Sequence, residues 1–491
     1  MNLYIKKKKR TSTYLIILAL IVLLLGSFWA YKKMMGWNLS EILLKSIQTN
    51  FATGENAEKK SEIIGLIPDL LGIGQPKTYL LLFENNTELR PGGGFIGSYA
   101  VVRVSNGEPE ILAMEGTELL DRRTPDDWKP VPPRPITDHL GVDRWYFRDS
   151  NWSPDFSVSA EKALEFYVGE GGTASDQIDT VVAFTPTVLE GLLELLGPIT
   201  VEDIEFTSGN VTEKLQYATG YGYSEKGLVF SERKEIMRSF FDVVLSKAKQ
   251  KGIFAIDDYI NLGIKMLDEK QIVIHSLDTD TQKKIIGINW DGEIDSVAGD
   301  YLVWVDANLA ALKTDHAMER TLNYSIEKNS ADQYVAKATM KYDHLGIFDW
   351  RTSRYRTYAR IFVPDGSKFL GVVGSMKTDR SMELGTVDIG RELGKQWFGT
   401  FISIEPGTNG ELSFSYILPD YIASQIDEGM YTLFVQKQLG TINHGLTLEL
   451  NFDNNIASAE PSEVESEWGD GVYRLETDLR TDKEFEIQMS S

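Results

Sequence analysis

The chain has 491 residues, with 50 Lys and Arg against 72 Asp and Glu, which gives a formal net charge of −22. Apolar residues make up 42% of it and aromatic residues 11%, which excludes a disordered polymer, and the length allows about three domains. The absence of Cys excludes disulfides, thiolate nucleophiles and Cys-ligated metals, and the acidic excess argues against nucleic acid as a partner.

The N-terminus is basic where the rest of the chain is acidic. Residues 14–30, YLIILALIVLLLGSFWA, carry no charge and lie between two basic clusters. With its flanks, a helix of this length spans a bilayer core of about 30 Å. The alternative is a cleaved signal peptide. Its cleavage site needs small residues, and Phe28 before Ala30 fits that pattern poorly. We expect a cytoplasmic basic tail (1–13), an uncleaved transmembrane helix (14–31) that anchors the protein in the bilayer of the cell membrane, and the bulk of the chain outside.

The next segments predict an α/β fold. Residues 38–74 are typical of a helical stalk. Residues 75–295 alternate apolar strands with amphipathic helices, which predicts a layered α/β domain. The expected strands are 78–83, 99–104, 109–114 and 179–184, and the expected helices are 157–167, 186–196 and 232–251.

The C-terminal third changes to short strands in which apolar and polar residues alternate. Such strands at 357–363, 411–418, 431–436 and 445–452 predict an antiparallel β-sandwich over residues 296–456. Residues 457–491 are expected to form a closing hairpin or tail, with strands at 472–479 and 484–489.

The segment from Glu84 to Tyr99, ENNTELRPGGGFIGSY, is the strongest candidate for a binding site. Three glycines, Gly92, Gly93 and Gly94, allow positive φ and bring backbone N–H groups together, which suits an anion. Arg90 adds a planar donor that matches phosphate. The loop lacks the Gly-Lys-Ser/Thr of a nucleotide P-loop, and a glycine hinge between two strands is the alternative interpretation.

This segment resembles the signature of a bacterial membrane-anchored family of unknown function, N-N-x-E-x-R-x-x-G-G-F-I-G-S at residues 85–98. The resemblance continues through residues 148–155 (RDSNWSPD), 179–201, 302–313 and 358–364. It covers nearly the whole segment beyond the predicted membrane helix. It implies a membrane-anchored protein without assigning an activity.

More distantly, the α/β part resembles the LytR-CpsA-Psr domain, whose members move glycopolymers from polyprenyl-pyrophosphate carriers onto peptidoglycan. By position, the resemblance implies that Glu88 and Arg90 match that family's acid-x-Arg pair at the pyrophosphate, and that Arg233 matches a later pyrophosphate-binding arginine. Residues 95–97 are Phe-Ile-Gly where those transferases have Arg-Ser-Asp. The arginine and the metal-associated aspartate of that motif are therefore missing.

Two further candidates, Arg148 and Asp149, lie in a Trp-rich loop ahead of a helix, although Asp149 could equally cap local backbone and pair with Arg148. The five histidines are scattered without metal-ligand spacing, so no metal site is predicted from them.

Our main hypothesis is an extracytoplasmic cell-envelope protein that binds an anionic polyprenyl-phosphate or glycan ligand, such as a polyprenyl-linked glycan or cell-wall polymer. No cofactor is assigned. The predicted ligand-binding residues are Arg90, Gly92, Gly93, Gly94, Arg148 and Arg233.

Two alternatives stay open. The first is a catalytic glycopolymer phosphotransferase in which Glu88 or Asp149 holds Mg²⁺. The second is a purely structural or adhesive surface protein, in which residues 85–98 only build a turn. A cluster of Arg90, Arg148 and Arg233 around one cavity would argue against the second alternative, and their dispersal would favour it.

Overall fold

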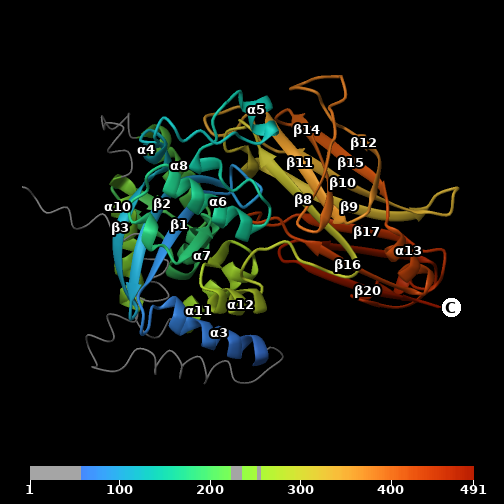
Figure 1. Cartoon of the computed structure of the whole chain (residues 1–491), viewed down its shortest axis with the longest axis horizontal. Coiled ribbons are helices and arrows are strands. Elements are labelled where there is room, and N and C mark those ends of the chain that lie inside the picture. The colour runs from blue at the N-terminus through green and yellow to red at the C-terminus, as the bar shows by residue number, and fades with distance from the viewer. Residues whose placement is uncertain (1–56, 223–234, 252–255, 491) are drawn as a thin grey trace, which may run out of the picture.

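The computed structural model describes residues 57–222, 235–251 and 256–490. In this part of the chain an α/β part precedes a β-sandwich, and the two lie side by side (Figure 1). The expected basic tail (1–13), transmembrane helix (14–31) and first half of the stalk lie outside the described residues. Among the described helices, none is both long and apolar enough to span a bilayer.

The α/β part is built on a five-stranded sheet of order β3-β2-β1-β4-β7. β1 and β4 are parallel, and the other neighbours are antiparallel. Because β1 and β4 run the same way, their carboxyl ends meet at one edge of the sheet. The strands are β1 (Lys77–Asn85), β2 (Phe95–Ser105), β3 (Glu108–Gly116), β4 (Thr180–Phe184) and β7 (Ile272–Ser276).

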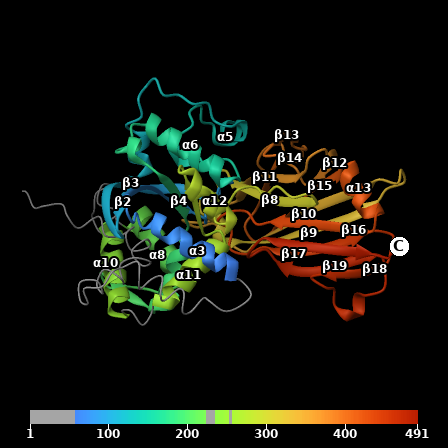
Figure 2. The same ribbon diagram turned by 60° about the horizontal axis from the view of Figure 1, so that its bottom comes forward.

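Helices cover both faces of this sheet (Figure 2). Leu81 of β1 packs into one apolar core, and Leu80 and Leu82 pack into the other, because successive strand side chains point to opposite faces. The first core includes residues of α3 (Ala57–Leu70), α7 (Thr187–Leu196), α8 (Val211–Tyr217), α10 (Glu235–Lys251), α11 (Ile256–Asp268), α12 (Thr279–Gly287) and the small hairpin β5 (Ile199–Val201) and β6 (Ile204–Phe206).

The second core includes residues of α4 (Thr117–Asp121), the 3₁₀ turn η1 (Phe147–Asp149) and α6 (Phe156–Gly169), while α5 (Arg134–Leu140) packs toward the sandwich. The burial of Thr180–Phe184 at all five positions explains the uninterrupted apolar sequence of β4. The prediction of an α/β fold is confirmed at this level.

Two sheets form the sandwich around a single apolar core. The six-stranded sheet has the order β12 (Lys368–Val373), β15 (Asn409–Ile417), β10 (Tyr334–His344), β9 (Met318–Lys328), β17 (Gly445–Asn451) and β19 (Val472–Asp478). The seven-stranded sheet has the order β13 (Asp388–Glu392), β14 (Lys395–Ile404), β11 (Tyr355–Pro364), β8 (Asp300–Asn308), β16 (Met430–Gln436), β20 (Lys483–Met489) and β18 (Ile456–Glu460).

Two details of the sandwich differ from the sequence prediction. The sandwich is not wholly antiparallel, because β16 pairs in parallel with β8 and β17 with β9. The expected closing hairpin is wrong, because β19 and β20 lie in different sheets. Tyr473 of β19 and Phe485 of β20 enter the same core from opposite sides, so the chain crosses between the sheets instead of turning back.

Candidate functional site

The glycine loop, residues 86–94 between β1 and β2, lies at the junction of the α/β part and the sandwich. The N–H of Asn308 at the end of β8 donates to the carbonyl of Leu89 over 3.0 Å. The N–H of Asp315 donates to the carbonyl of Thr87 over 3.2 Å. The loop therefore joins the two halves of the described chain through its backbone.

Arg90 is buried at this junction, with 3% of its surface exposed. Its Nε donates to Oδ1 of Asp149 over 2.8 Å, and its Nη1 donates to the carbonyl of Asn308 over 2.8 Å. Its Nη2 lies 3.4 Å from Oε1 of Glu88. The guanidinium thus connects the glycine loop, η1 and β8, and its donors are directed to protein groups.

The three glycines pack closely against their neighbours. Gly93 has a φ of +136°, and a Cβ there would collide with the Glu84 carboxylate. A Cβ on Gly94 would lie 2.5 Å from the backbone carbon of Asn85. The N–H of Gly92 donates to the carbonyl of Asn151, and that of Gly93 donates to the carbonyl of Arg90. These two N–H groups are satisfied inside the protein and do not converge on an open anion site.

Glu84, at the end of β1, is a site residue that the sequence reasoning missed. Its Oε1 accepts from Nδ2 of Asn151 over 2.8 Å, and the same nitrogen also donates to the carbonyl of Gly94. Burial raises the pKa of Glu84 well above its usual value, which favours the uncharged carboxylic acid. The available signal was an acid that directly follows the fully apolar strand 78–83.

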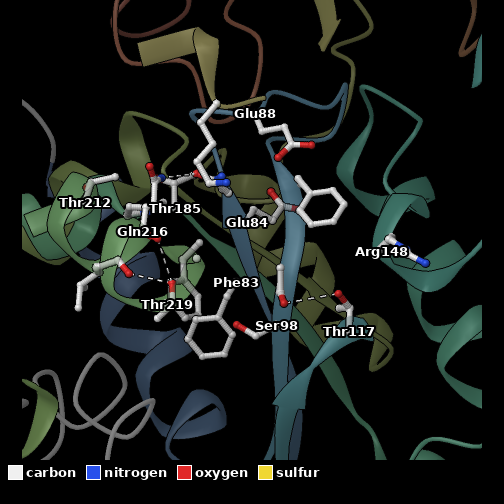
Figure 3. Close-up of a pocket in the computed structure, with 18 of the residues that line it drawn as sticks. Phe83, Glu84, Glu88, Ser98, Thr117, Arg148, Thr185, Thr212, Gln216 and Thr219 are labelled. Carbon is white, nitrogen blue, oxygen red and sulfur yellow. Dashed lines mark hydrogen bonds between the residues drawn. The ribbon is translucent and has the colours of Figure 1, made fainter. Parts of the chain in front are cut away.

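A pocket of about 470 Å³, called here the strand-end pocket, opens where β1 and β4 end (Figure 3). This is the edge at which open α/β sheets commonly bind ligands. Phe83 and Phe184 pack edge to face there, with ring centroids 4.5 Å apart. Its apolar lining is completed by Phe95, Pro186, Leu189 and Leu215, and its charged lining residues are Glu84, Glu88, Glu118, Arg148 and Lys313.

The two cations of this pocket differ in how they are held. Nε of Arg148 lies 2.7 Å from Oδ2 of Asp121, and its guanidinium lies 5.1 Å from the centre of the Tyr146 ring. Lys313, by contrast, makes no ion pair with any residue that the structure describes. Burial also raises the pKa of Glu88.

The structure brings only some of the predicted site residues together. Glu88 and Arg148 line the strand-end pocket, whereas Arg90, Asp149 and the glycines 92–94 lie outside its lining. Arg233 lies outside the described residues. Asp149 accepts from Arg90, and the described part of the chain contains no group of three or more Asp, Glu or His side chains arranged for a metal ion.

A pair of buried acids lies behind Arg148. Glu170 accepts from the N–H of Phe147 over 2.7 Å. Apart from the ion pair of Arg148 with Oδ2 of Asp121, the Asp121 oxygens and Oε2 of Glu170 have no donor among the described residues, and a proton shared between the two carboxyls would supply one. Burial, together with the Asp121 carboxylate, raises the pKa of Glu170.

Because of this pair, we expect the stability of the folded protein to fall as the pH rises. Because the folded protein holds the Glu170 proton more tightly than the unfolded chain does, the stabilisation is complete below the usual Glu pKa of 4.5 and is lost as the pH rises toward the raised pKa. We expect the melting temperature of the wild type to fall between about pH 5 and pH 8 more steeply than that of Glu170→Gln. The exposed Glu165→Gln is the control, and equal slopes for all three proteins would contradict the assignment.

Comparisons with known proteins give a family match without an activity. Residues 74–219 match the family described as "Protein of unknown function (DUF4012)". No curated protein sequence matches the chain. The resemblance to the LytR-CpsA-Psr domain stays a prediction.

Solved structures give only weak likenesses. Protein gbs0355 from Streptococcus agalactiae is 14% identical, with a TM-score of 0.26 over 44% of this chain and 74% of that one. Lin1025 protein from Listeria innocua is 10% identical, with a TM-score of 0.23 over 44% of this chain and 80% of that one. Both likenesses are too weak to assign a fold or a function.

Proposed function

We propose that the α/β part binds an amphipathic anion, a polyprenyl phosphate or a polyprenyl-linked glycan, in the strand-end pocket. The observation that carries the proposal is that one pocket combines a mostly apolar lining surface, to which six aromatic and aliphatic side chains contribute, with two cations, Arg148 and Lys313. The apolar chain lies against Phe83, Phe184 and Leu215, and the anionic head contacts the cations. The glycine loop supports the wall of the pocket and does not itself hold the head group.

The size of the pocket and the raised pKa of Glu84 both support such a ligand. The pocket volume of about 470 Å³ falls within the usual range of small-molecule sites. Each buried CH₂ of an apolar chain contributes about 0.8 kcal/mol. Burial raises the pKa of Glu84 well above its usual value, which favours its uncharged carboxyl and reduces its repulsion of an anionic head.

The cellular setting of this proposal rests on the sequence. A transmembrane helix at residues 14–31 with the bulk of the chain outside would hold the pocket near the outer surface of the membrane, where lipid carriers of envelope glycans are exposed. Binding is proposed in place of phosphotransfer because the Asp149 carboxylate is engaged by Arg90. A polyprenyl-linked glycan or cell-wall polymer is therefore the proposed partner.

A substitution that fills the pocket tests the proposal. Gly97 lines the pocket, and a Cβ there meets open space, so Gly97→Leu adds volume without a backbone collision. Calorimetric titration of the full chain in detergent with geranyl pyrophosphate is expected to give saturable binding that Gly97→Leu abolishes. Gly209→Leu is the matched control, because Gly209 has equally open surroundings outside the pocket. Absence of binding by the folded wild type would refute the proposal.

The head-group contact has its own test. Lys313→Ala removes the pocket cation that has no ion pair within the described residues. We expect about a tenfold loss of affinity for geranyl pyrophosphate, since hydrogen bonds to charged groups contribute about 1.5–3 kcal/mol. Affinity for uncharged geraniol should not change. The exposed Lys341→Ala on β10 is the control. An equal loss for both ligands would mean that Lys313 shapes the pocket without contacting the head.

A further inference from the structure

A second cavity, of about 290 Å³, lies between the α/β part and the sandwich, and we propose that it binds the oxyanion of a sugar-sized ligand. Its lining comes from the glycine loop, α7, α8, residues 315–320 at the start of β9, Arg351 and residues 440–444. We call it the junction cavity. It is separate from the strand-end pocket, with which it shares only Thr212, and the inference does not depend on the function proposed above.

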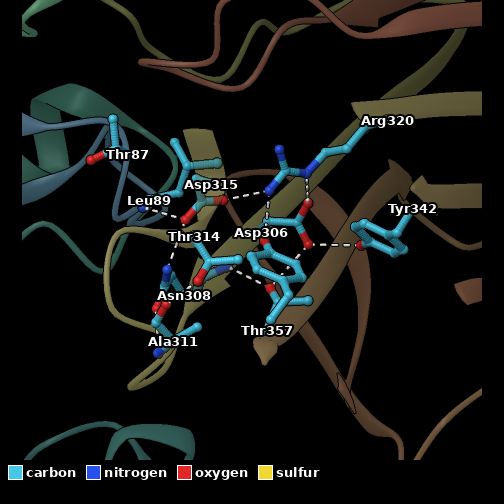
Figure 4. A network of polar contacts seen from close by, with 12 residues as sticks. Thr87, Leu89, Asp306, Asn308, Ala311, Thr314, Asp315, Arg320, Tyr342 and Thr357 are labelled. Atoms are coloured by element: carbon cyan, nitrogen blue, oxygen red, sulfur yellow. Dashed lines mark hydrogen bonds and ion pairs between the residues drawn. The ribbon is translucent and has the colours of Figure 1, made fainter. Parts of the chain in front are cut away.

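Arg320 of β9 supplies the first oxyanion donor. It is 7% exposed, and Figure 4 shows it in a buried network with Asp306 and Asp315. Its Nε lies 3.2 Å from Oδ2 of Asp306, and its Nη2 donates to Asp315 and to the hydroxyl of Tyr355. Its Nη1 donates to no residue that the structure describes, so one fixed N–H₂ group is left for a ligand.

Arg351 supplies the second donor and has fewer partners. It is 8% exposed, and its one ion pair within the described chain joins Nη1 to Oε2 of Glu213 over 3.8 Å, too long for a hydrogen bond. Its Nε is buried without an acceptor. A buried guanidinium without hydrogen bonds is costly, and a carboxylate or phosphate supplies the planar acceptors that it lacks.

The acids that line the cavity are already occupied. Oδ2 of Asp315 accepts from the N–H of Leu89 over 3.1 Å and from Nδ2 of Asn308 over 2.8 Å. Oδ1 of Asp315 accepts from Arg320, and the Glu190 carboxylate accepts from Thr212. The buried side-chain atoms of this lining that have no hydrogen bond within the described chain are therefore donors, on Arg320 and Arg351, which favours an anion.

The remaining polar lining suits a hydroxylated ligand. Burial lowers the pKa of His316 and of His444, so both rings favour the neutral form and offer hydrogen bonds without adding charge. Asn443 is exposed at the edge of the cavity and adds an amide. The volume of about 290 Å³ is at the lower end for small-molecule sites. A monosaccharide that carries a phosphate or a carboxylate fits this combination.

The test is a calorimetric titration of the full chain in detergent with glucose 1-phosphate, galacturonate, glucose and inorganic phosphate. We expect binding of at least one of the two anionic sugars and none of glucose. The preferred anionic sugar distinguishes a phosphate site from a carboxylate site. Binding of inorganic phosphate alone, or of no anion, would overturn the proposal.

The variant Arg351→Ala tests whether the ligand binds in the junction cavity. Because the Arg351 guanidinium makes no hydrogen bond within the described chain, the variant should fold, which its melting temperature checks, and affinity should fall about 10- to 100-fold. Arg354→Ala is the matched control, since Arg354 is bound to Glu405 and Asp379 outside the cavity. Undiminished binding by a folded Arg351→Ala would overturn the proposal.

Discussion

Replacing Arg90 with alanine is expected to lower the free energy of unfolding by about 3–5 kcal/mol. The substitution leaves the Asp149 carboxylate and the Asn308 carbonyl without the donors that Arg90 now supplies, at a largely buried junction. Urea denaturation of the full chain in detergent, followed by intrinsic fluorescence, measures the loss. Because Arg90 connects the α/β part to the sandwich, we also expect increased proteolysis between the two.

Arg103→Ala is the control for this experiment. Arg103 forms an ion pair with Glu110 over 3.5 Å, but both side chains are substantially exposed, at 37% and 66%, so its removal should cost less than about 1 kcal/mol. If Arg90→Ala were as stable as Arg103→Ala and only bound ligand less well, Arg90 would be a ligand contact and its assignment to the junction would be wrong.

Gly94→Ala is expected to destabilise the protein by about 3 kcal/mol, the upper end of the usual cost of overpacking. The added Cβ would lie 2.5 Å from the backbone carbon and 2.6 Å from the carbonyl oxygen of Asn85. Backbone atoms at the end of β1 cannot rotate away as a flexible side chain would, so the loop itself must shift. The melting temperature and the urea midpoint both measure this cost.

The matched control is Gly209→Ala, where a Cβ meets no atom within 4 Å and the expected change is within about 0.5 kcal/mol. Equal stability of the two variants would mean that the glycine loop can accommodate a Cβ at Gly94 without a steric clash. It would then fit an open anion cradle better than a packed junction.

The layers of the fold could be predicted from the sequence because each strand and helix is indicated by the pattern of its own residues. Thr78 to Phe83 and Thr180 to Phe184 are uninterrupted apolar runs, and both became central strands with helices on each face. The alternating C-terminal strands likewise predicted a sandwich. The sheet that each strand joins depends on distant partners, which explains the errors over the parallel β8–β16 pair and over β19 and β20.

The candidate site was harder to predict for the same reason. A glycine loop with an arginine has the same sequence pattern whether its hydrogen-bond donors bind an anion or bind other groups of the protein. The deciding acceptor, the Asn308 carbonyl, lies 218 residues from Arg90 in the sequence. The walls of the strand-end pocket come from segments that lie far apart in the chain, as Phe83, Phe184 and Leu215 show, and only residues 85–98 and Arg148 stood out in the sequence.

The central claim is that an amphipathic anion binds at the carboxyl ends of β1 and β4, beside a glycine loop that is structural. Photocrosslinking of the full chain with a benzophenone-bearing geranyl pyrophosphate, followed by mass-spectrometric mapping of the labelled peptides, tests it most directly. We expect label within residues 83–98, 184–189 or 212–220, displaced by unlabelled geranyl pyrophosphate and lost in Gly97→Leu. Displaceable label confined to the strands of the sandwich or to residues 14–31 would contradict it.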